Sequence, residues 1–290
     1  SLFTVFALAA GLAVELYRQR KSEAALLNFL EDPNDKTQEI LFAQFGDSEA
    51  VCALGKRFLA GKSLVDEKTV ELSEYREYIE AWVHEVKTPL SLLTLVCNNH
   101  RDEMSPYVYA RFCYIRHQLN ENMERVLYYA RLQEEHSDIK FTRFRLDECL
   151  AEVLLEYQTF IDERRIALSQ NFRPLEVVSD RRIVLFILSQ LFSNAVKYAD
   201  SRGGRISVTM ESDRDKIYLR LYNNGEGVLP EDLPFIFDKG FTGSYPNRQK
   251  ATGMGLYLVR KYARKLCVEV RPVSRIPFES GFGIELIFVL

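Results

Sequence analysis

One histidine in this chain stands in a setting that suits nucleophilic chemistry. Residues 80–90 read EAWVHEVKTPL, with His84 near the centre. Trp82 and Val86 lie two positions to either side, about 200° around a helix. His84 is therefore expected to point into solvent, away from the apolar side of the helix on which these two residues lie. Glu85, next in the chain, can hold the imidazole or accept its proton. The segment predicts an imidazole nucleophile that a second domain can reach.

Two other interpretations of this segment have to be weighed. Taken alone, a surface histidine beside a glutamate is most often a solvated pair. A zinc-protease motif requires a second histidine four positions after the first, and Thr88 stands there instead. The zinc interpretation is therefore excluded, and the solvated pair stays open.

A second candidate lies in residues 190–198, QLFSNAVKY. Asn194 and Lys197 are one helical turn apart, so both can face a triphosphate. An amide oxygen suits Mg²⁺ and an ammonium suits phosphate. By itself this signal is weak, because most Asn and Lys residues on amphipathic helices only face solvent.

Glycines mark two further segments, NNGEGV at residues 223–228 and TGMGL at residues 252–256. Glycine lets the backbone approach a nucleotide closely, and the free amides at the start of a helix bind anionic oxygens. Neither segment is a P-loop, because the chain lacks the Gly-Lys-Ser/Thr ending. Each glycine pair alone is more typical of a turn.

An aromatic segment lies between the two glycine segments. Residues 235–243 read FIFDKGFTG and lead into the polar stretch from Ser244 to Ala251. This pattern is typical of a mobile lid with aromatic anchors, which closes over a bound ligand.

Two long amphipathic helices are expected to carry the histidine. From about Leu64 to Asn98, apolar residues recur in steps of four and three, at Tyr75, Ile79, Trp82, Val86, Pro89, Leu93 and Val96. After a polar break, a second helix is expected from about Pro106 to Gln133, with Phe112, Ile115, Leu119, Met123, Val126 and Ala130 on one side. A hairpin this apolar is expected to pair with a second copy, as a four-helix bundle.

Beyond residue 140 the mixed periodicity predicts an α/β layer. Helical patterns occupy residues 146–163, 181–199 and 255–265, and alternating patterns predict strands at residues 205–210, 216–221 and 283–290. These elements must position the asparagine, glycine and aromatic segments.

The start of the chain has a different character. An apolar run from Leu2 to Val14 is followed by Arg18, Arg20 and Lys21. Residues 1–17 are expected to be the end of a truncated transmembrane helix, with the basic residues on the cytoplasmic side. A buried helix of a soluble domain stays an alternative, because a glutamate interrupts the run. A signal peptide would have its basic residues before the apolar stretch.

Residues 18–63 are expected to be a cytoplasmic connector of short helices. Breaks are predicted at Asp32–Asp35 and again near Gly61.

Composition excludes several classes of protein. The chain of 290 residues is 47% hydrophobic, enough for two ordinary cores. A net charge of −3 leaves no broad basic surface, so nucleic acid is not an expected partner. The five cysteines are far apart and odd in number, which indicates neither a zinc clasp nor a disulfide framework.

Taken in order, these segments resemble the bacterial sensor histidine kinases of two-component systems. The resemblance covers residues 64–290 and implies a dimerisation and phosphotransfer hairpin at 64–138. An ATP-binding α/β sandwich of the Hsp90, gyrase and histidine-kinase type would follow at 140–290. The homodimer would autophosphorylate His84 from ATP and pass the phosphoryl group to an aspartate of a response regulator.

The resemblance also implies roles for individual residues. His84 would be the phosphoacceptor with Glu85 beside it, and Thr88 would position a water that dephosphorylates the regulator. Asn194 would bind Mg²⁺ and Asn223 would face adenine. The rest of the nucleotide site would be Lys197, Tyr198, Gly225, Gly227, Lys239, Gly240, Phe241, Thr242, Thr252, Gly253, Gly255 and Leu256.

The sequences of these segments are similar to those of the bacitracin-sensor, or intramembrane-sensing, group. Trp82 precedes the histidine, and KGFTG precedes GMGLYLV. The resemblance implies a membrane protein that works with a peptide-antibiotic ABC transporter.

Two positions depart from the family pattern. Gln190 replaces a first asparagine, and Asn223 stands where the general pattern has Asp. A neutral amide is expected to bind adenine less tightly than a carboxylate, by about five- to tenfold. The second departure keeps open a catalytically weak ATP-binding scaffold at the membrane. A separate alternative is an ATP-driven clamp built on the same sandwich, which would leave the exposed His84 with Glu85 and Thr88 unexplained.

Overall fold

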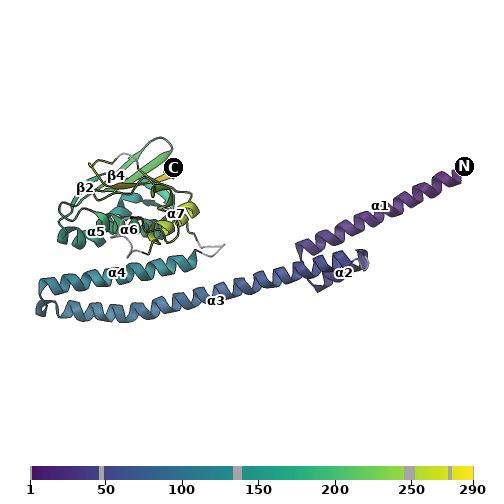
Figure 1. The fold of residues 1–290 in the computed structure, drawn as a ribbon, viewed down its shortest axis with the longest axis horizontal. Helices are drawn as coiled ribbons and strands as arrows, with labels where there is room; N and C mark the ends of the chain where they lie inside the picture. Colours follow the sequence, from purple (N-terminus) through teal and green to yellow (C-terminus); the bar gives the residue numbers. More distant parts are fainter. Residues whose placement is uncertain (1, 46–48, 133–138, 245–251, 274–275, 290) are drawn as a thin grey trace. The chain divides into compact units, whose positions relative to one another are not determined.

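The computed structural model describes residues 2–45, 49–132, 139–244, 252–273 and 276–289 (Figure 1). It divides into two compact units, Ser1–Tyr78 and Ile79–Leu290. The expected boundary between residues 63 and 64 therefore lies inside the first unit. The second unit contains the expected hairpin from Ile79 onward together with the expected sandwich.

Three helices make up the first unit: α1 (Leu2–Glu31), α2 (Asp35–Phe45) and the first part of α3 (Glu49–Asn99). The predicted break at Asp32–Asp35 is confirmed. Asn34 and Thr37 stabilise it reciprocally, because the Thr37 amide donates to Asn34 Oδ1 and the Asn34 amide to Thr37 Oγ1, each at 3.0 Å.

The predicted break near Gly61 is wrong, and so is a helix start at Leu64. Helix α3 is continuous from Glu49, with Gly61 in its interior. A glycine inside a helix costs only about 1 kcal/mol relative to alanine, which the strong helix formers around it outweigh.

Helix α1 also runs without interruption across the expected boundary between residues 17 and 18. Among the residues that the structure describes, no helix is both long enough and apolar enough to cross a membrane.

In the second unit, α3 and α4 (Pro106–Arg131) form the expected hairpin, joined through the short helix η1 (Arg101–Glu103). Ser105 caps α4 by accepting from the Val108 amide at 3.3 Å. Near the open end, Arg131 Nε donates to Glu80 Oε1 at 2.8 Å. The buried contacts between the helices are made by Val83, Leu90 and Met123, flanked by Ile79, Val86 and Leu127.

The expected seam is split between two faces. On α3, Ile79 and Val86 face α4, but Trp82, Leu93 and Val96 are 40%, 48% and 53% exposed. On α4, Met123 and Ala130 are buried, whereas Ile115, Leu119 and Val126 remain exposed. The helices therefore carry more apolar surface than one hairpin buries.

The α/β part has one layer of helices against one sheet. Its helices are α5 (Leu146–Glu163), α6 (Arg181–Tyr198) and α7 (Gly255–Lys265), and η2 (Leu233–Phe235) is a single turn. The sheet has the order β2-β4-β5-β7-β6, in which only β2 and β4 are parallel. Its strands are β2 (Ala167–Asn171), β4 (Arg205–Ser212), β5 (Lys216–Asn223), β6 (Glu269–Pro272) and β7 (Phe282–Val289). A separate pair joins β1 (Thr142–Arg145) to β3 (Glu176–Ser179).

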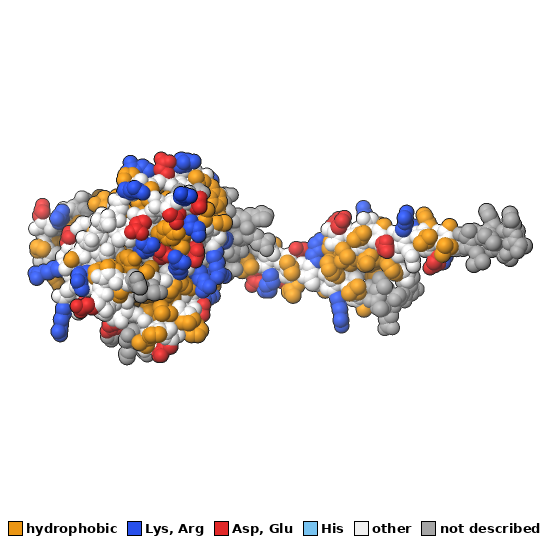
Figure 2. Space-filling model, turned by 90° about the horizontal axis from the view of Figure 1, so that it is seen from above, with side chains coloured by type: hydrophobic (Ala, Val, Ile, Leu, Met, Phe, Trp, Pro, Cys, Tyr) orange, Lys and Arg blue, Asp and Glu red, His pale blue; other side chains and the backbone are white. Residues whose placement is uncertain are grey.

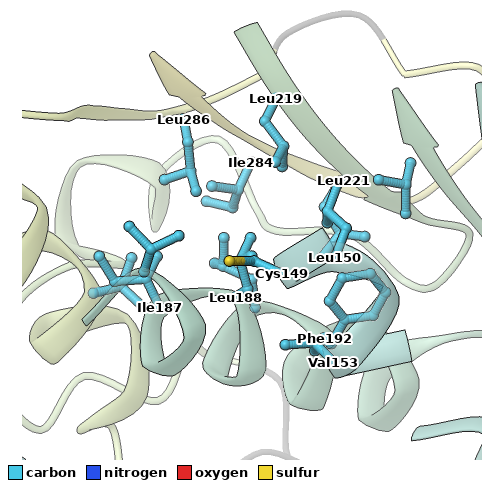
Figure 3. Close-up of a cluster of buried hydrophobic side chains, with 14 of the residues drawn as sticks. Cys149, Leu150, Val153, Ile187, Leu188, Phe192, Leu219, Leu221, Ile284 and Leu286 are labelled. Atoms are coloured by element: carbon cyan, nitrogen blue, oxygen red, sulfur yellow. The ribbon is translucent and has the colours of Figure 1, made fainter. Parts of the chain in front are cut away.

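The core lies between the helices and the sheet, and Figure 3 shows its centre. Side chains of α5 and α6 meet those of β5 and β7 there, among them Cys149, Leu150, Val153, Ile187, Leu188, Phe192, Leu219, Leu221, Ile284 and Leu286. Asp180 begins α6 by accepting from the amides of Arg182 and Ile183.

The three predicted helices and three predicted strands of this part are confirmed, with small shifts at their ends. The α5 and α7 bounds agree with the expected ranges, and α6 ends one residue early. Strands β1, β2, β3 and β6 are additional, each four or five residues long. Over the face drawn in Figure 2, acidic and basic side chains are interspersed, as the small net charge suggests.

Candidate functional site

A cavity of about 410 Å³ lies within the second unit, between α4, α5, α6 and the segments that precede and open α7. Eleven of the fourteen expected nucleotide-site residues line it: Asn194, Lys197, Tyr198, Asn223, Gly227, Phe241, Thr242, Thr252, Gly253, Gly255 and Leu256. The structure thus brings together segments that are up to 62 residues apart, from 194 to 256.

Helix α6 supplies Asn194 and Lys197 from its last two turns, as their spacing predicted. Asn194 is half-buried and Lys197 is exposed, with its ammonium 5.0 Å from the ring centre of Tyr198. The amide can therefore coordinate a metal ion while the ammonium reaches phosphate.

Asn223 ends β5 and is buried, at 6% exposure. Its Nδ2 donates to the Tyr198 carbonyl at 3.1 Å, which anchors the side chain to the end of α6. A carbonyl oxygen can only accept, so this bond identifies the amide atom facing Tyr198 as Nδ2 and the other atom as Oδ1. Among the described residues no donor is bonded to the amide oxygen, so this oxygen can accept from a ligand in the cavity that Asn223 lines.

The beginning of α7 forms another part of the wall. No side chain within the described ranges caps this helix, and a Cβ at Gly255 would lie 3.3 Å from Gln190 Oε1 and 3.9 Å from Asn194 Nδ2. The uncapped N-terminus therefore lies close to the amide of α6. Free amides and the helix dipole make such an end favourable for an anion.

Gly253 holds the preceding turn together. Its φ is +64°, and a Cβ there would lie 2.3 Å from the carbonyl carbon of Gly240. The Gly240 amide donates to the Gly253 carbonyl at 3.1 Å. Only glycine fits both the backbone angle and the close approach.

Three expected residues do not line the cavity: Gly225, Lys239 and Gly240. Gly225 has a packing role, because a Cβ would lie 1.9 Å from the Tyr198 carbonyl oxygen. The Lys239 ammonium instead donates to the Tyr129 hydroxyl of α4 at 2.5 Å, and this bond raises the pKa of the lysine. Of the expected lid, residues 245–251 lie outside the described part of the chain.

His84, Glu85 and Thr88 lie on α3 and are exposed, as the helical spacing predicted for the histidine. Val83 and Leu90 are the buried neighbours that fix this orientation. The Thr88 hydroxyl donates to the His84 carbonyl at 3.3 Å. None of the three side chains lines the cavity.

The sequence prediction missed the wall that α4 contributes. Its residues are Tyr114, His117, Gln118, Glu121, Asn122 and Arg125. They recur at intervals of three and four, beside the apolar stripe that identified the helix. A second, mostly polar stripe on one helix was the signal that could have revealed this contact.

The α4 wall is joined to α5 by a buried hydrogen bond. Tyr157 donates its hydroxyl to Glu121 Oε1 at 2.5 Å, and both residues are less than 9% exposed. Burial, with the neighbouring Glu121, holds the pKa of Tyr157 well above its usual value. Burial lowers the pKa of His117, whose ring contacts those of both Tyr157 and Phe160.

The chemistry of the cavity suits magnesium and ATP. It combines the Asn194 amide, the Lys197 ammonium and the start of α7, which no described side chain caps. Gln190, beside Gly255 but outside the cavity lining, is 2% exposed, and its Nε2 has no hydrogen-bond partner among the described residues. No group of three metal-binding side chains occurs in the described ranges. Mg²⁺ commonly needs only one or two protein ligands when phosphates and waters supply the others.

Comparison with known proteins agrees with this geometry. Residues 179–288 match the family described as histidine kinase-, DNA gyrase B- and HSP90-like ATPase. The sensor protein BceS of Bacillus subtilis (strain 168) is 28% identical over 244 residues, which are 82% of this chain and 70% of that protein.

Two further relatives extend the agreement. The sensor histidine kinase YxdK of the same organism is 31% identical over 65% of this chain and 58% of that protein. The sensor histidine kinase GraS of Staphylococcus epidermidis (strain ATCC 12228 / FDA PCI 1200) is 25% identical over 100% of this chain and 83% of that protein. The fold is similar to that of full-length ShkA in complex with AMPPNP, with a TM-score of 0.51 and 21% identity over 73% of this chain and 45% of that one.

The ordered motifs, the cavity they line and the match of residues 179–288 to an ATPase family agree with these relatives. The chain is thus similar to the bacterial sensor histidine kinases, the ATP-dependent protein-histidine kinases of two-component systems, and within them to the group of the bacitracin sensor BceS.

Proposed function

We propose that His84 is the phosphoacceptor and that the cavity beside α6 holds the ATP. Residues 64–138 would serve as the dimerisation and phosphotransfer hairpin and residues 140–290 as the catalytic domain. The observation that carries this proposal is the exposed imidazole of His84, next to Glu85, in a chain whose other expected motifs line one cavity.

In the reaction, a ring nitrogen of His84 attacks the γ-phosphorus of ATP. A nitrogen–phosphorus bond forms, the bond from the γ-phosphorus to the bridging oxygen breaks, and ADP leaves with that oxygen. The imidazole becomes cationic in this step, and Glu85 accepts the proton it releases. The exposure of His84 allows the nucleotide to approach it in line.

The phosphoryl group would then pass to an aspartate of a response regulator. Thr88, one turn from His84, would position a water that later hydrolyses the regulator's phosphoaspartate. Thr88→Ala should autophosphorylate normally but remove phosphate from the regulator more slowly. Equal rates of removal in both proteins would contradict this role.

Asn194 would bind Mg²⁺ through its amide oxygen, next to the phosphates that Lys197 reaches. Asn194→Asp keeps the shape but adds a negative charge beside the triphosphate. We expect loss of productive ATP binding with little change in melting temperature. If calorimetric titration gives the natural affinity, Asn194 is only a helix-surface residue.

The biological setting is inferred from the resemblance to the bacitracin-sensor group. The kinase would be attached to the membrane through its apolar N-terminal segment and would detect antimicrobial peptides together with an ABC transporter. In cells, the output promoter should respond to peptide only when that transporter is present. A response in cells without the transporter would contradict the partnership.

Radiolabelled ATP tests the central proposal. The natural chain should acquire acid-labile label, and His84→Gln should acquire none while it still binds ATP, because nucleophile and cavity involve different residues. Hydrolysis without label would favour an ATP-driven clamp, and neither activity would favour a scaffold. Label that persists on His84→Gln would place the phosphoacceptor elsewhere.

A further inference from the structure

One arginine of α4 projects into the cavity that holds the expected ATP-binding residues. Arg125 is half-buried and lines the same cavity as Asn194 and Lys197, although it comes from the hairpin and they come from α6. Neither the order of the motifs nor the spacing on α6 assigns it a role.

The guanidinium of Arg125 is oriented by its own helix. Nη2 donates to the Asn122 side-chain oxygen at 2.6 Å, and Nε lies 3.4 Å from the Glu121 carbonyl oxygen. A guanidinium has five N–H donors, so these two bonds leave three for a ligand. An arginine held in this way loses little side-chain entropy when it binds an anion.

The charges around the cavity favour an anion. Arg125, Arg164 and Lys197 are its three basic side chains of fixed charge, and Glu121 is the one carboxylate among the lining residues. Arg164 is occupied at the end of α6, where Nη1 donates to the Val196 carbonyl at 2.7 Å. Arg125 and Lys197 are therefore the two cations best placed to bind phosphate.

Several contacts hold the α/β layers against α4 near this site. The Tyr262 hydroxyl of α7 donates to the Tyr128 carbonyl at 2.7 Å, and the rings of Tyr128 and Phe186 stack at 3.7 Å. With the bond between Tyr157 and Glu121, these contacts keep Arg125 facing the cavity. A nucleotide in the cavity would thus meet side chains of both the hairpin and the catalytic layers.

We propose that Arg125 binds the phosphate groups of the nucleotide, so that α4 forms part of the nucleotide site and bound ATP fastens the catalytic layers to the hairpin. This inference rests on the proposed function, since it takes the cavity to be the ATP site. It predicts that the phosphates, and not the adenosine, connect the two parts.

The test titrates the full chain with a nonhydrolysable ATP analogue and, separately, with adenosine. Arg125→Gln should weaken binding of the analogue by about ten- to a hundredfold, because a bond to a charged group is lost. Adenosine binding and the melting temperature should not change. Arg125→Lys should recover part of the affinity, and Arg116→Gln, a change on the same helix outside the cavity lining, should have no effect.

Hydrogen exchange gives a second readout that does not depend on affinity. The ATP analogue should slow exchange along α4 in the natural chain, and adenosine should not. In Arg125→Gln saturated with the analogue, this protection should be lost.

The outcomes separate the inference from the proposed function. If the natural chain binds the analogue and Arg125→Gln binds it equally well, the inference is wrong and the ATP site stands. If Arg125→Gln loses adenosine as well, the arginine only supports the fold and the inference also fails. If the natural chain binds no nucleotide, both proposals fall.

Discussion

At the scale of single residues, the site is defined by what each side chain is already bonded to. Asn223 has an amide NH₂ group where the aspartate of the family pattern has a second carboxylate oxygen. This amide nitrogen donates to a specific partner, the Tyr198 carbonyl. Gly225 lies where any Cβ would overlap that same carbonyl oxygen. The end of α6 therefore constrains the Asn223 side of the cavity through one backbone group.

This constraint changes the expectation for Asn223→Asp. A carboxylate would gain a charged bond to the adenine amino group, about 1 kcal/mol stronger than a neutral one. It would also lose the donor to Tyr198 and place one oxygen against another, at a comparable cost. We therefore expect the affinity for an ATP analogue to change less than the five- to tenfold gain expected from the sequence.

Calorimetric titration of both proteins measures this difference. Asn223→Ala serves as the comparison, because it removes both the bond to Tyr198 and the acceptor for adenine. A tenfold tighter complex with Asn223→Asp would mean that the bond to Tyr198 contributes nothing to the orientation of the side chain.

At the scale of elements, one buried hydrogen bond is part of the contact of α4 with α5. Tyr157→Phe leaves the buried Glu121 carboxylate without the hydroxyl that it now accepts from. We expect a loss of about 1–3 kcal/mol in the free energy of unfolding, the usual cost of a buried polar group without a partner. Denaturant titration measures it.

Two variants sharpen this prediction. Tyr107→Phe removes the hydroxyl of a tyrosine that is 73% exposed at the start of α4, and it should not change stability. Tyr157→Phe combined with Glu121→Leu should recover part of the loss, because the unpaired carboxylate is removed as well, although Ser189 still loses its contact with the Tyr157 hydroxyl. If the double variant loses more free energy of unfolding than the two single variants lose together, the carboxylate has another role.

The same contact predicts how stability depends on pH. Burial lowers the pKa of His117 in the folded protein, although Glu121 opposes the shift and Arg116 adds to it. The unfolded chain therefore binds a proton before the folded one as the pH falls below about 6.5, which destabilises the folded state.

We expect the melting temperature of the natural chain to fall from about pH 7.5 to about pH 5.5 more than that of His117→Gln. Glu156, whose Oε1 lies 3.5 Å from His117 Nδ1, has a pKa raised by burial and acts in the opposite direction at lower pH. The comparison with His117→Gln separates the two groups. Parallel curves for the two proteins would assign the pH dependence to other residues.

At the scale of the whole molecule, the apolar surface that one hairpin leaves exposed predicts a homodimer. Leu93 of α3 and Leu119 of α4 are 48% and 43% exposed on the hairpin. Leu93→Lys combined with Leu119→Lys should shift the mass in solution from twice 33.7 kDa toward the single chain. Leu155→Lys, a change at a leucine that is 78% exposed on α5, should leave the mass unchanged.

Sedimentation at several protein concentrations measures the shift. If one subunit phosphorylates its partner, the amount of acid-labile label should decrease as the fraction of dimer decreases. If each subunit phosphorylates itself, the label should persist. A natural chain that sediments as a monomer at all concentrations would contradict the four-helix bundle.

The sequence by itself determined what depends on neighbours along the chain. Helical spacing predicted that His84 is exposed and that Asn194 and Lys197 face one side, and periodicity predicted the bounds of α5 and α7. The order of the motifs predicted the similarity to sensor histidine kinases. These features follow from local geometry, in which residues three or four apart share a face of a helix.

Only the tertiary structure decided what depends on contacts between distant segments. It bonded the Lys239 ammonium to the Tyr129 hydroxyl, gave Gly225 a packing role and brought Arg125 into the cavity lining. Strands as short as β1 and β2 gain their stability from partners far along the chain, so they leave little periodic signal. A polar stripe on α4 looks like a solvated face in the sequence, and the layer that packs against it makes it a wall of the site.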